Sequence, residues 1–285
     1  MARGSRQRFP VVMSKLRYIG LVGGVLCLVP ATAGVIAALV GWLPHDPTAF
    51  VGAPNAVPSA HNLLGCDALG RDLLSRLWSA AAAFTPPGAL AMVVALVAGT
   101  VLGLAESLAG RFWGAISSWL LQVLDSLPKF VIVLLVASIT RSDLTWIMGA
   151  VGATFAPQIA GAIRSSVIRL RAAAFIEAER SLGVGLLRIL FVHILWGNAR
   201  RVILSQLMSL MAYALLVETS LSYLGGELGV QEPTASWGNM IALARDGVFD
   251  GHYLPVFVPA AMISLTILGF TMVGQSLLEI VEERQ

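Results

Sequence analysis

Long uncharged stretches are the feature of this sequence that most restricts how it can fold. Asp, Glu, Lys and Arg are absent from four stretches, which lie between Arg17 and Asp46, Arg76 and Glu106, Asp143 and Arg164, and Asp250 and Glu279. Each has room for the roughly 20 apolar residues that cross the hydrocarbon core of a bilayer. Only 12% of all residues are charged, whereas soluble domains carry about 25%. The sequence therefore predicts a membrane protein.

Two further apolar segments bring the number of predicted spans to six. Residues 202–223 form one of them, and residues 113–140 form the other, which two charges and a proline interrupt. The first span, residues 19–43, is too long for a secretory signal and is expected to be an uncleaved helix. The predicted fold is all-α: a polytopic bundle of six transmembrane helices with a cytoplasmic loop between the fourth and fifth spans.

Basic residues gather on one predicted side of the membrane. The N-terminal tail holds five Lys and Arg residues, and the passage from Arg164 to Arg201 holds seven arginines. By the positive-inside rule, we expect both termini and this passage to face the cytoplasm. The net charge of +3 then reflects membrane topology, and we expect no nucleic-acid partner.

These observations divide the chain into four predicted parts. They are a basic cytoplasmic tail (1–18), a first transmembrane helix (19–43), an outer loop (44–84) and a core of five helices (85–281). Within the core, the cytoplasmic passage covers about residues 165–201 and a second outer loop covers about residues 225–250. The sequence TPPG at residues 85–88 is predicted to break the helix that leads into the second span.

Several classes of functional site are absent from the sequence. Lys15 and Lys129 are the only lysines, and neither lies in a glycine-rich phosphate loop. We find no nucleophile–histidine–carboxylate set and no cysteine spacing typical of a metal or redox site. Cys27 and Cys66 are not expected to form a disulfide, because one lies in a span and the other in a loop. We therefore predict no catalytic residue, no metal site and no cofactor bound by this chain.

The cytoplasmic passage combines charge with helical character. Glu177 and Arg180 stand near the start of a predicted short helix, Gly183 interrupts it, and Arg188 lies in a second amphipathic piece. Glycine lets the backbone turn and lets another surface approach closely. A short helix held between two spans can act as a lever on both. The alternative is an ordinary cytosolic loop with solvated charges.

This passage resembles the EAA loop of ABC importer permeases. The matching positions are Glu177, Ala178, Arg180, Gly183, Arg188, Ile189, His193 and Leu195. The sequence departs from the family pattern at Glu179, Trp196 and Gly197.

Two predicted outer segments resemble elements of the dipeptide/oligopeptide/nickel branch of that family. In LGCDALGRDLLSR, the matches are Gly65, Asp67, Gly70, Arg71, Asp72, Ser75 and Arg76, and Cys66 replaces a threonine. In ETSLSYLGGELGVQEPTASWGNMI, the matches include Glu218, Leu224, Gly225, Gln231, Pro233, Trp237 and Gly238. The second segment carries two extra residues, placed at Gly226 and Glu227, and Glu232 and Ala235 replace prolines. The resemblance covers residues from about 17 to 280.

The resemblance implies a function and a set of partners. The chain would be a bacterial inner-membrane permease subunit that pairs with a second permease subunit, two cytoplasmic ATPase subunits and an extracytoplasmic substrate-binding protein. ATP and magnesium would bind to the ATPase subunits, and the EAA loop would dock onto them as a coupling helix. Peptides are the first expected cargo, and nickel or a metal chelate is the second. The alternative from another class is a secondary carrier or channel without an ATPase, for which we would expect inverted repeats that we do not see.

The remaining charged residues allow more than one interpretation. Asp125 and Lys129 are four residues apart, so we expect them to share a helix face and to pair; a place on the translocation path is the alternative. For Glu218, a gating or helix-anchoring role and a plain interfacial position are equally open. We expect the outer motifs to stabilise the fold and the contact with the partner permease, with local Arg–carboxylate bonds formed by GRD, rather than to bind substrate.

Overall fold

The computed structural model describes residues 8–108, 110–140, 143–171, 185, 188, 196–197, 199–225 and 228–282. The long helices are α1 (Arg8–Val40), α2 (Leu73–Leu108), α5 (Leu144–Arg171), α8 (Arg200–Leu224) and α10 (Leu254–Glu282). The shorter elements are α3 (Gly110–Ser126), α4 (Lys129–Ile139), α9 (Trp237–Ala244) and the 3-10 turn η2 (Asp246–Val248). The five long helices are apolar enough to cross a membrane, and α3 with α4 forms a bent pair that makes a sixth candidate. The predicted all-α membrane bundle is confirmed.

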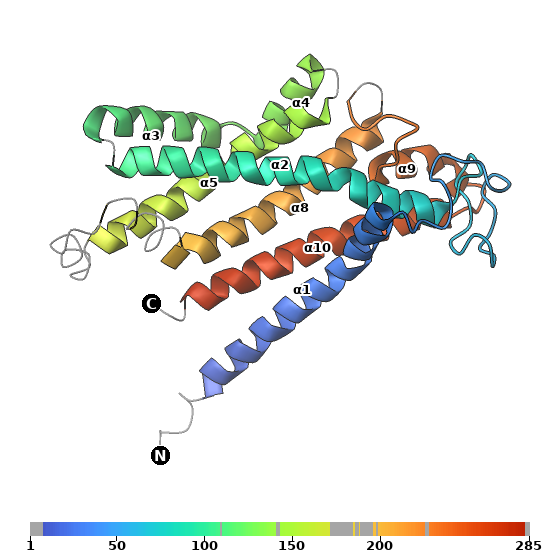
Figure 1. Cartoon of the computed structure of the whole chain (residues 1–285), viewed down its shortest axis with the longest axis horizontal. Helices are drawn as coiled ribbons and strands as arrows, with labels where there is room; N and C mark the ends of the chain where they lie inside the picture. Colours follow the sequence, from blue (N-terminus) through green and yellow to red (C-terminus); the bar gives the residue numbers. More distant parts are fainter. Residues whose placement is uncertain are drawn as a thin grey trace.

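The helices run side by side with clearly different ends (Figure 1). One end of the bundle holds the start of α1, the end of α5, the start of α8 and the end of α10. We call this the terminal end. The opposite end, which we call the loop end, carries α9 and the long loop between α1 and α2. The described ends of the helices that lead to the two termini and to the charged passage therefore share one side, as predicted.

Small residues let α2 and α5 pack closely. A Cβ atom added at Gly99 would lie 2.6 Å from Cβ of Ile159, and one added at Gly103 would lie 2.8 Å from Cα of Ala160. These glycines form a G-x-x-x-G pair, the spacing that brings helix backbones together in membranes. The core at this contact is completed by Ala91, Ala95, Val151 and Ile163.

The predicted helix break at TPPG is wrong. Helix α2 runs without interruption through Pro86 and Pro87. Membrane helices tolerate proline where neighbouring helices and Ser or Thr side chains compensate the backbone. Here Thr85 Oγ1 donates to the Ala81 carbonyl at 3.0 Å. Helix α2 begins at Leu73, in agreement with a helix predicted to start near Asp67 or Asp72 within the segment 44–84.

The third predicted span is bent. The axes of α3 and α4 differ by 88°, and Pro128, which precedes α4, accounts for the break because the residue before a proline avoids the helical conformation. Asp125 and Lys129 therefore lie on different helices, so the prediction of one shared helix face is wrong. Lys129 Nζ instead lies 3.9 Å from the ring centroid of Phe155 on α5.

Candidate functional site

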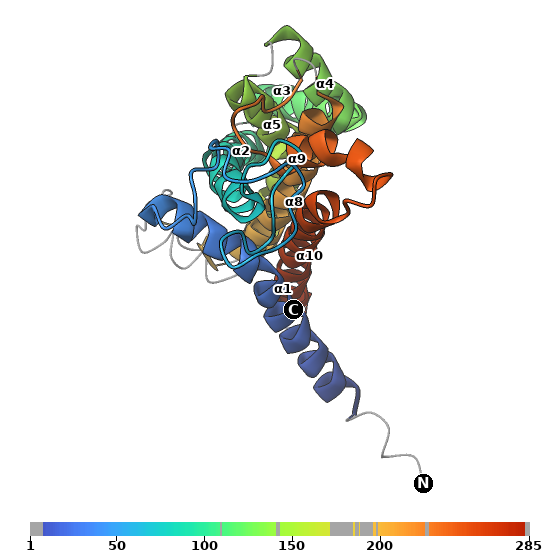
Figure 2. The ribbon, with the colours of Figure 1, turned by 90° about the vertical axis from the view of Figure 1, so that its right-hand side faces the viewer.

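Two segments far apart in the sequence meet at the loop end of α2. One is the loop that precedes α2, and the other is the loop that precedes α9. Figure 2 faces this end and shows the first loop lying over the start of α2 beside α9. Both segments carry the family motifs recognised in the sequence.

A cluster of two arginines and two carboxylates joins these segments. Arg71 Nε donates to Asp67 Oδ2 at 2.8 Å, and Arg71 Nη1 donates to Glu232 Oε2 at 2.6 Å. Arg76 Nη2 donates to Glu232 Oε1 at 2.9 Å. Arg71, Arg76 and Asp67 are buried, whereas the Glu232 side chain is 39% exposed. We call these four residues the arginine cluster.

At Arg71, charge pairing outweighs burial. Burial alone would lower the pKa of Arg71, but hydrogen bonds to Glu232 and Asp67 raise it above its ordinary value. Arg71 therefore stays charged. The predicted local Arg–carboxylate bond of GRD is confirmed by the contact of Arg71 with Asp67, which precedes the motif.

The other residues of the first motif shape the turn and the start of α2. Asp72 accepts hydrogen bonds from the backbone N–H of Ser75 at 2.8 Å and from its hydroxyl at 2.6 Å. Carboxylates at this position satisfy the free N–H groups of a helix start. Gly65 and Gly70 have φ angles of +80° and +85°, and a Cβ atom at either would contact a backbone oxygen of the same loop. Their roles are thus conformational.

The second motif starts α9 and inserts an aromatic side chain into the core. Asn239 N donates to Ser236 Oγ at 3.1 Å, and Ser236 N donates to Asn239 Oδ1 at 3.0 Å, which is a reciprocal cap. Trp237 Nε1 donates to the Leu77 carbonyl of α2 at 2.9 Å. Trp237 is only 3% exposed, so its ring belongs to the core. Gly238 allows this packing, because a Cβ atom there would meet the Thr219 carbonyl of α8.

Glu218 is buried near the end of α8 and anchors the loop before α9. Ser222 Oγ donates to Glu218 Oε1 at 2.8 Å and accepts from Val230 N at 3.0 Å. Of the two interpretations of Glu218, these bonds favour helix anchoring, and its 3% exposure rules out a plain interfacial position.

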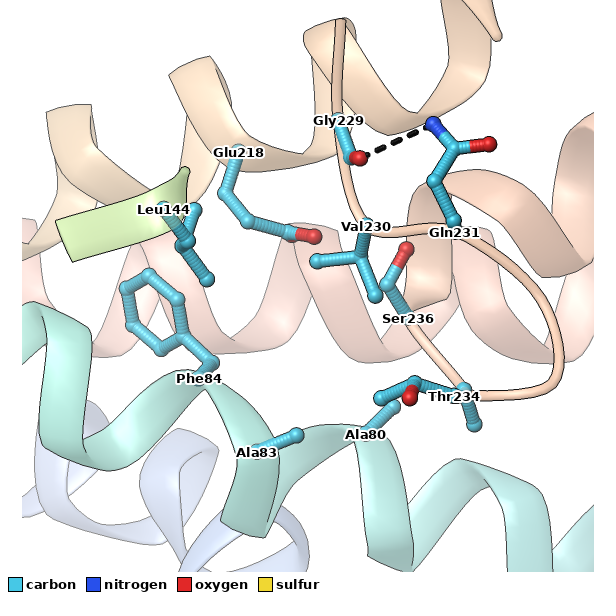
Figure 3. Close-up of a pocket in the computed structure, with 11 residues that line it drawn as sticks. Ala80, Ala83, Phe84, Leu144, Glu218, Gly229, Val230, Gln231, Thr234 and Ser236 are labelled. Atoms are coloured by element: carbon cyan, nitrogen blue, oxygen red, sulfur yellow. Dashed lines mark hydrogen bonds between the residues drawn. The ribbon is translucent and has the colours of Figure 1, made fainter. Parts of the chain in front are cut away.

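A cavity of about 310 Å³ adjoins Glu218 (Figure 3). Its walls come from α2, the first residue of α5, the Glu218 region of α8 and the loop before α9. Gln231 lies at its edge, where its Nε2 donates to the Gly229 carbonyl at 3.0 Å. The motif residues thus hold the loop before α2, the start of α2 and the loop before α9 together, and a small cavity lies beside these contacts.

The remaining predicted residues lie apart from this chamber or outside the described structure. Leu224 is exposed at the end of α8, Gly225 follows it with φ of +69°, and Pro233 O lies 3.5 Å from Arg76 Nη1. In the predicted coupling passage, Arg188 is described and exposed. Glu177, Ala178, Arg180, Gly183 and His193 lie outside the described residues.

Glu232 is a site residue whose role was not predicted from the sequence. This residue stood out only as a replacement for a family proline, yet it pairs with both buried arginines. Ser222, which links Glu218 to Val230, was also missed. The predicted outer loop already holds three Asp residues for its two arginines, so the local sequence gave no signal for a distant acidic partner.

Comparison with known proteins agrees with this architecture. A family model described as the binding-protein-dependent transport system inner membrane component matches residues 95–285. A Brucella suis protein described as a peptide transport system permease is 30% identical over 290 residues, which cover 96% of this chain and 92% of the relative. The glutathione transport system permease protein GsiD of Pectobacterium atrosepticum is 31% identical over 226 residues, 78% of this chain and 73% of the relative. The chain therefore belongs to the inner-membrane permeases of binding-protein-dependent ABC importers, in their peptide and oligopeptide family.

Proposed function

We propose that this chain forms half of a translocation pathway for peptides across a bacterial inner membrane. A second permease subunit supplies the other half, and two cytoplasmic ATPase subunits, which hold ATP and magnesium, drive transport. An extracytoplasmic binding protein delivers the cargo to the loop end. Both termini and the passage at residues 165–201 face the cytoplasm.

The connection between α5 and α8 is the observation that carries this proposal. The passage that resembles the EAA loop joins the end of α5 to the start of α8, both at the terminal end. A partner that holds this passage can therefore move both helices together. Transport requires that the docked passage fit the open and closed ATPase pair differently, because a ligand shifts an equilibrium only by its differential affinity.

Peptide cargo is favoured by the names of the relatives. They are described as permeases of peptide and of glutathione transport systems, and glutathione is itself a small peptide. Nickel or a metal chelate stays the second candidate. A secondary carrier without an ATPase is the rival function.

Co-purification from native membranes tests the proposal. A tagged chain should bring down a second permease and an ATPase subunit in stoichiometric amounts, and peptide uptake into vesicles should stop when ATP is depleted. Isolation of the chain without any ATPase, together with uptake driven by an ion gradient alone, would support the carrier instead.

A further inference from the structure

The cavity beside Glu218 has two chemically different walls. Glu218, Gln231, Thr234 and Ser236 provide polar atoms, and Ala80, Ala83, Phe84 and Leu144 provide an apolar surface. Figure 3 shows the Glu218 side chain extending from α8 toward Val230 and Ser236 at the centre of this space. The carboxylate is thus presented to the cavity.

Glu218 has neutral hydrogen-bond partners and no basic partner among the described residues. Ser222 Oγ donates to it at 2.8 Å, and Thr219 Oγ1 lies at 3.5 Å. Hydroxyl donors stabilise a carboxylate but do not cancel its charge. A buried carboxyl without a counter-charge either stays protonated or pairs with a cation, because an unpaired buried charge is costly. The site can reduce that cost by binding a cation in the adjoining space.

The chemistry of the walls selects the kind of cation. Calcium takes six to eight oxygen ligands, several of them carboxylates, and the described residues hold no group of three or more His, Cys, Asp and Glu side chains that could bind a metal. An apolar wall favours carbon atoms next to the charge over a hydrated inorganic ion. The Phe84 ring in that wall can also attract a cation that lies over its face.

We propose that this cavity binds the primary ammonium group of a small aliphatic ligand, such as the N-terminus of a short peptide. Glu218 holds the ammonium group, and the wall of Ala80, Ala83, Phe84 and Leu144 contacts the attached carbon atoms. A cavity of about 310 Å³ is at the lower limit of ligand sites, which hold about 300–1,000 Å³, so it accepts the first residues of a peptide and not a long chain. This inference rests on the proposed peptide transport, whose cargo contact it specifies.

Calorimetric titration of the purified assembly in lipid nanodiscs, without the binding protein, tests the inference. The probes are dialanine, which has a free ammonium group, and N-acetyl-dialanine, which lacks it. We expect wild type to bind dialanine at least about tenfold more tightly than the acetylated form, since removing one partner of a buried charge pair is costly. In Glu218→Gln, the affinity for dialanine should fall to that for the acetylated peptide.

Two further variants serve as controls, one that blocks the cavity and one that removes a carboxylate elsewhere. Ala83→Leu fills the cavity without altering the carboxylate and should abolish binding of both peptides. Glu106→Gln removes a carboxylate that pairs with Arg164 at 3.0 Å, far from the cavity, and should leave both affinities unchanged. Equal affinity of wild type for the two peptides, no binding of either at 20 mM, or unaltered dialanine binding in Glu218→Gln would overturn the inference. The ATPase co-purification result would stand independently of any of these outcomes.

Discussion

Arg76 and Glu232 are 156 residues apart in the sequence, yet Arg76 Nη2 donates to Glu232 Oε1 at 2.9 Å. Arg76 is completely buried in the first turns of α2, and Glu232 lies in the loop before α9. The pair therefore ties the loop before α9 to the second transmembrane helix. Through Arg71, the same carboxylate also holds the loop before α2.

Replacing Glu232 should loosen this brace. In Glu232→Gln, two buried arginines keep Asp67 as their main counter-charge. Breaking a fully buried ion pair costs about 3–5 kcal/mol, and we expect about 1–3 kcal/mol here because the Glu232 side chain is 39% exposed and water screens exposed pairs. Thermal unfolding of the purified chain in detergent measures the loss.

An exposed pair at the same end provides the control. Arg245 Nε lies 3.5 Å from Asp246 Oδ1, and both side chains are largely exposed. Asp246→Asn should leave the unfolding temperature unchanged, since exposed pairs contribute little. If both variants unfold at the wild-type temperature, the arginine cluster does not brace the fold.

The sequence predicted the parts of this structure that depend on local pattern. The uncharged runs located the spans because hydropathy is a property of neighbouring residues. The GRD motif predicted a local Arg–carboxylate bond, and the structure forms it between Arg71 and Asp67, which are four residues apart. The Glu232 contacts could not be predicted, since loop closure over 156 residues leaves no local signal. The uninterrupted course of α2 through Pro86 and Pro87 was missed for a similar reason, because packing against other helices can override a local rule.

The reactivity of Cys66 reports whether the loop before α2 stays packed at the loop end. The thiol is 1% exposed, and burial raises its pKa, with Asp72 and Asp67 raising it further. In a Cys27→Ser background, we expect maleimide to label the native protein at pH 8 at least about tenfold more slowly than the unfolded chain, because only the thiolate reacts. Glu232→Gln should speed this labelling. Equal rates for native and unfolded chains would contradict the closed arrangement.

The raised pKa of Cys66 also sets the sign of a pH effect. In the unfolded state, the thiol loses its proton near the ordinary cysteine pKa of about 8.5. In the native state, the raised pKa keeps the thiol protonated to a higher pH. The unfolded state therefore binds fewer protons above its own pKa, and stability should fall as pH rises further. Cys66→Ser should reduce this alkaline loss of stability, which unfolding temperatures measured from pH 7 to 10 would show.

The G-x-x-x-G contact between α2 and α5 should tolerate no added methyl group. In Gly103→Ala the new Cβ would lie 2.8 Å from Cα of Ala160, and overpacking of this kind costs about 1–3 kcal/mol. Gly161→Ala is the matched control, because Gly161 is exposed on α5 with nothing within 4 Å of the new atom. That change should raise helix stability by up to about 1 kcal/mol. Unfolding temperatures that shift in the same direction would disprove the close contact.

Replacement of Gly183 tests the proposed coupling between ATP hydrolysis and uptake. Gly183 lies outside the described residues, and its expected role comes from the resemblance to the EAA loop. A leucine at this position should prevent the turn or the close approach of the ATPase surface. In reconstituted vesicles with the binding protein, we expect Gly183→Leu to hydrolyse ATP while peptide uptake falls at least about tenfold, a loss of about 1.4 kcal/mol of coupling. Gly161→Leu, on the exposed face of α5, should keep both activities. Normal ATP-driven uptake by Gly183→Leu would refute the proposed coupling role of Gly183. A passage that tolerates leucine at this position does not need a close contact with the ATPase there.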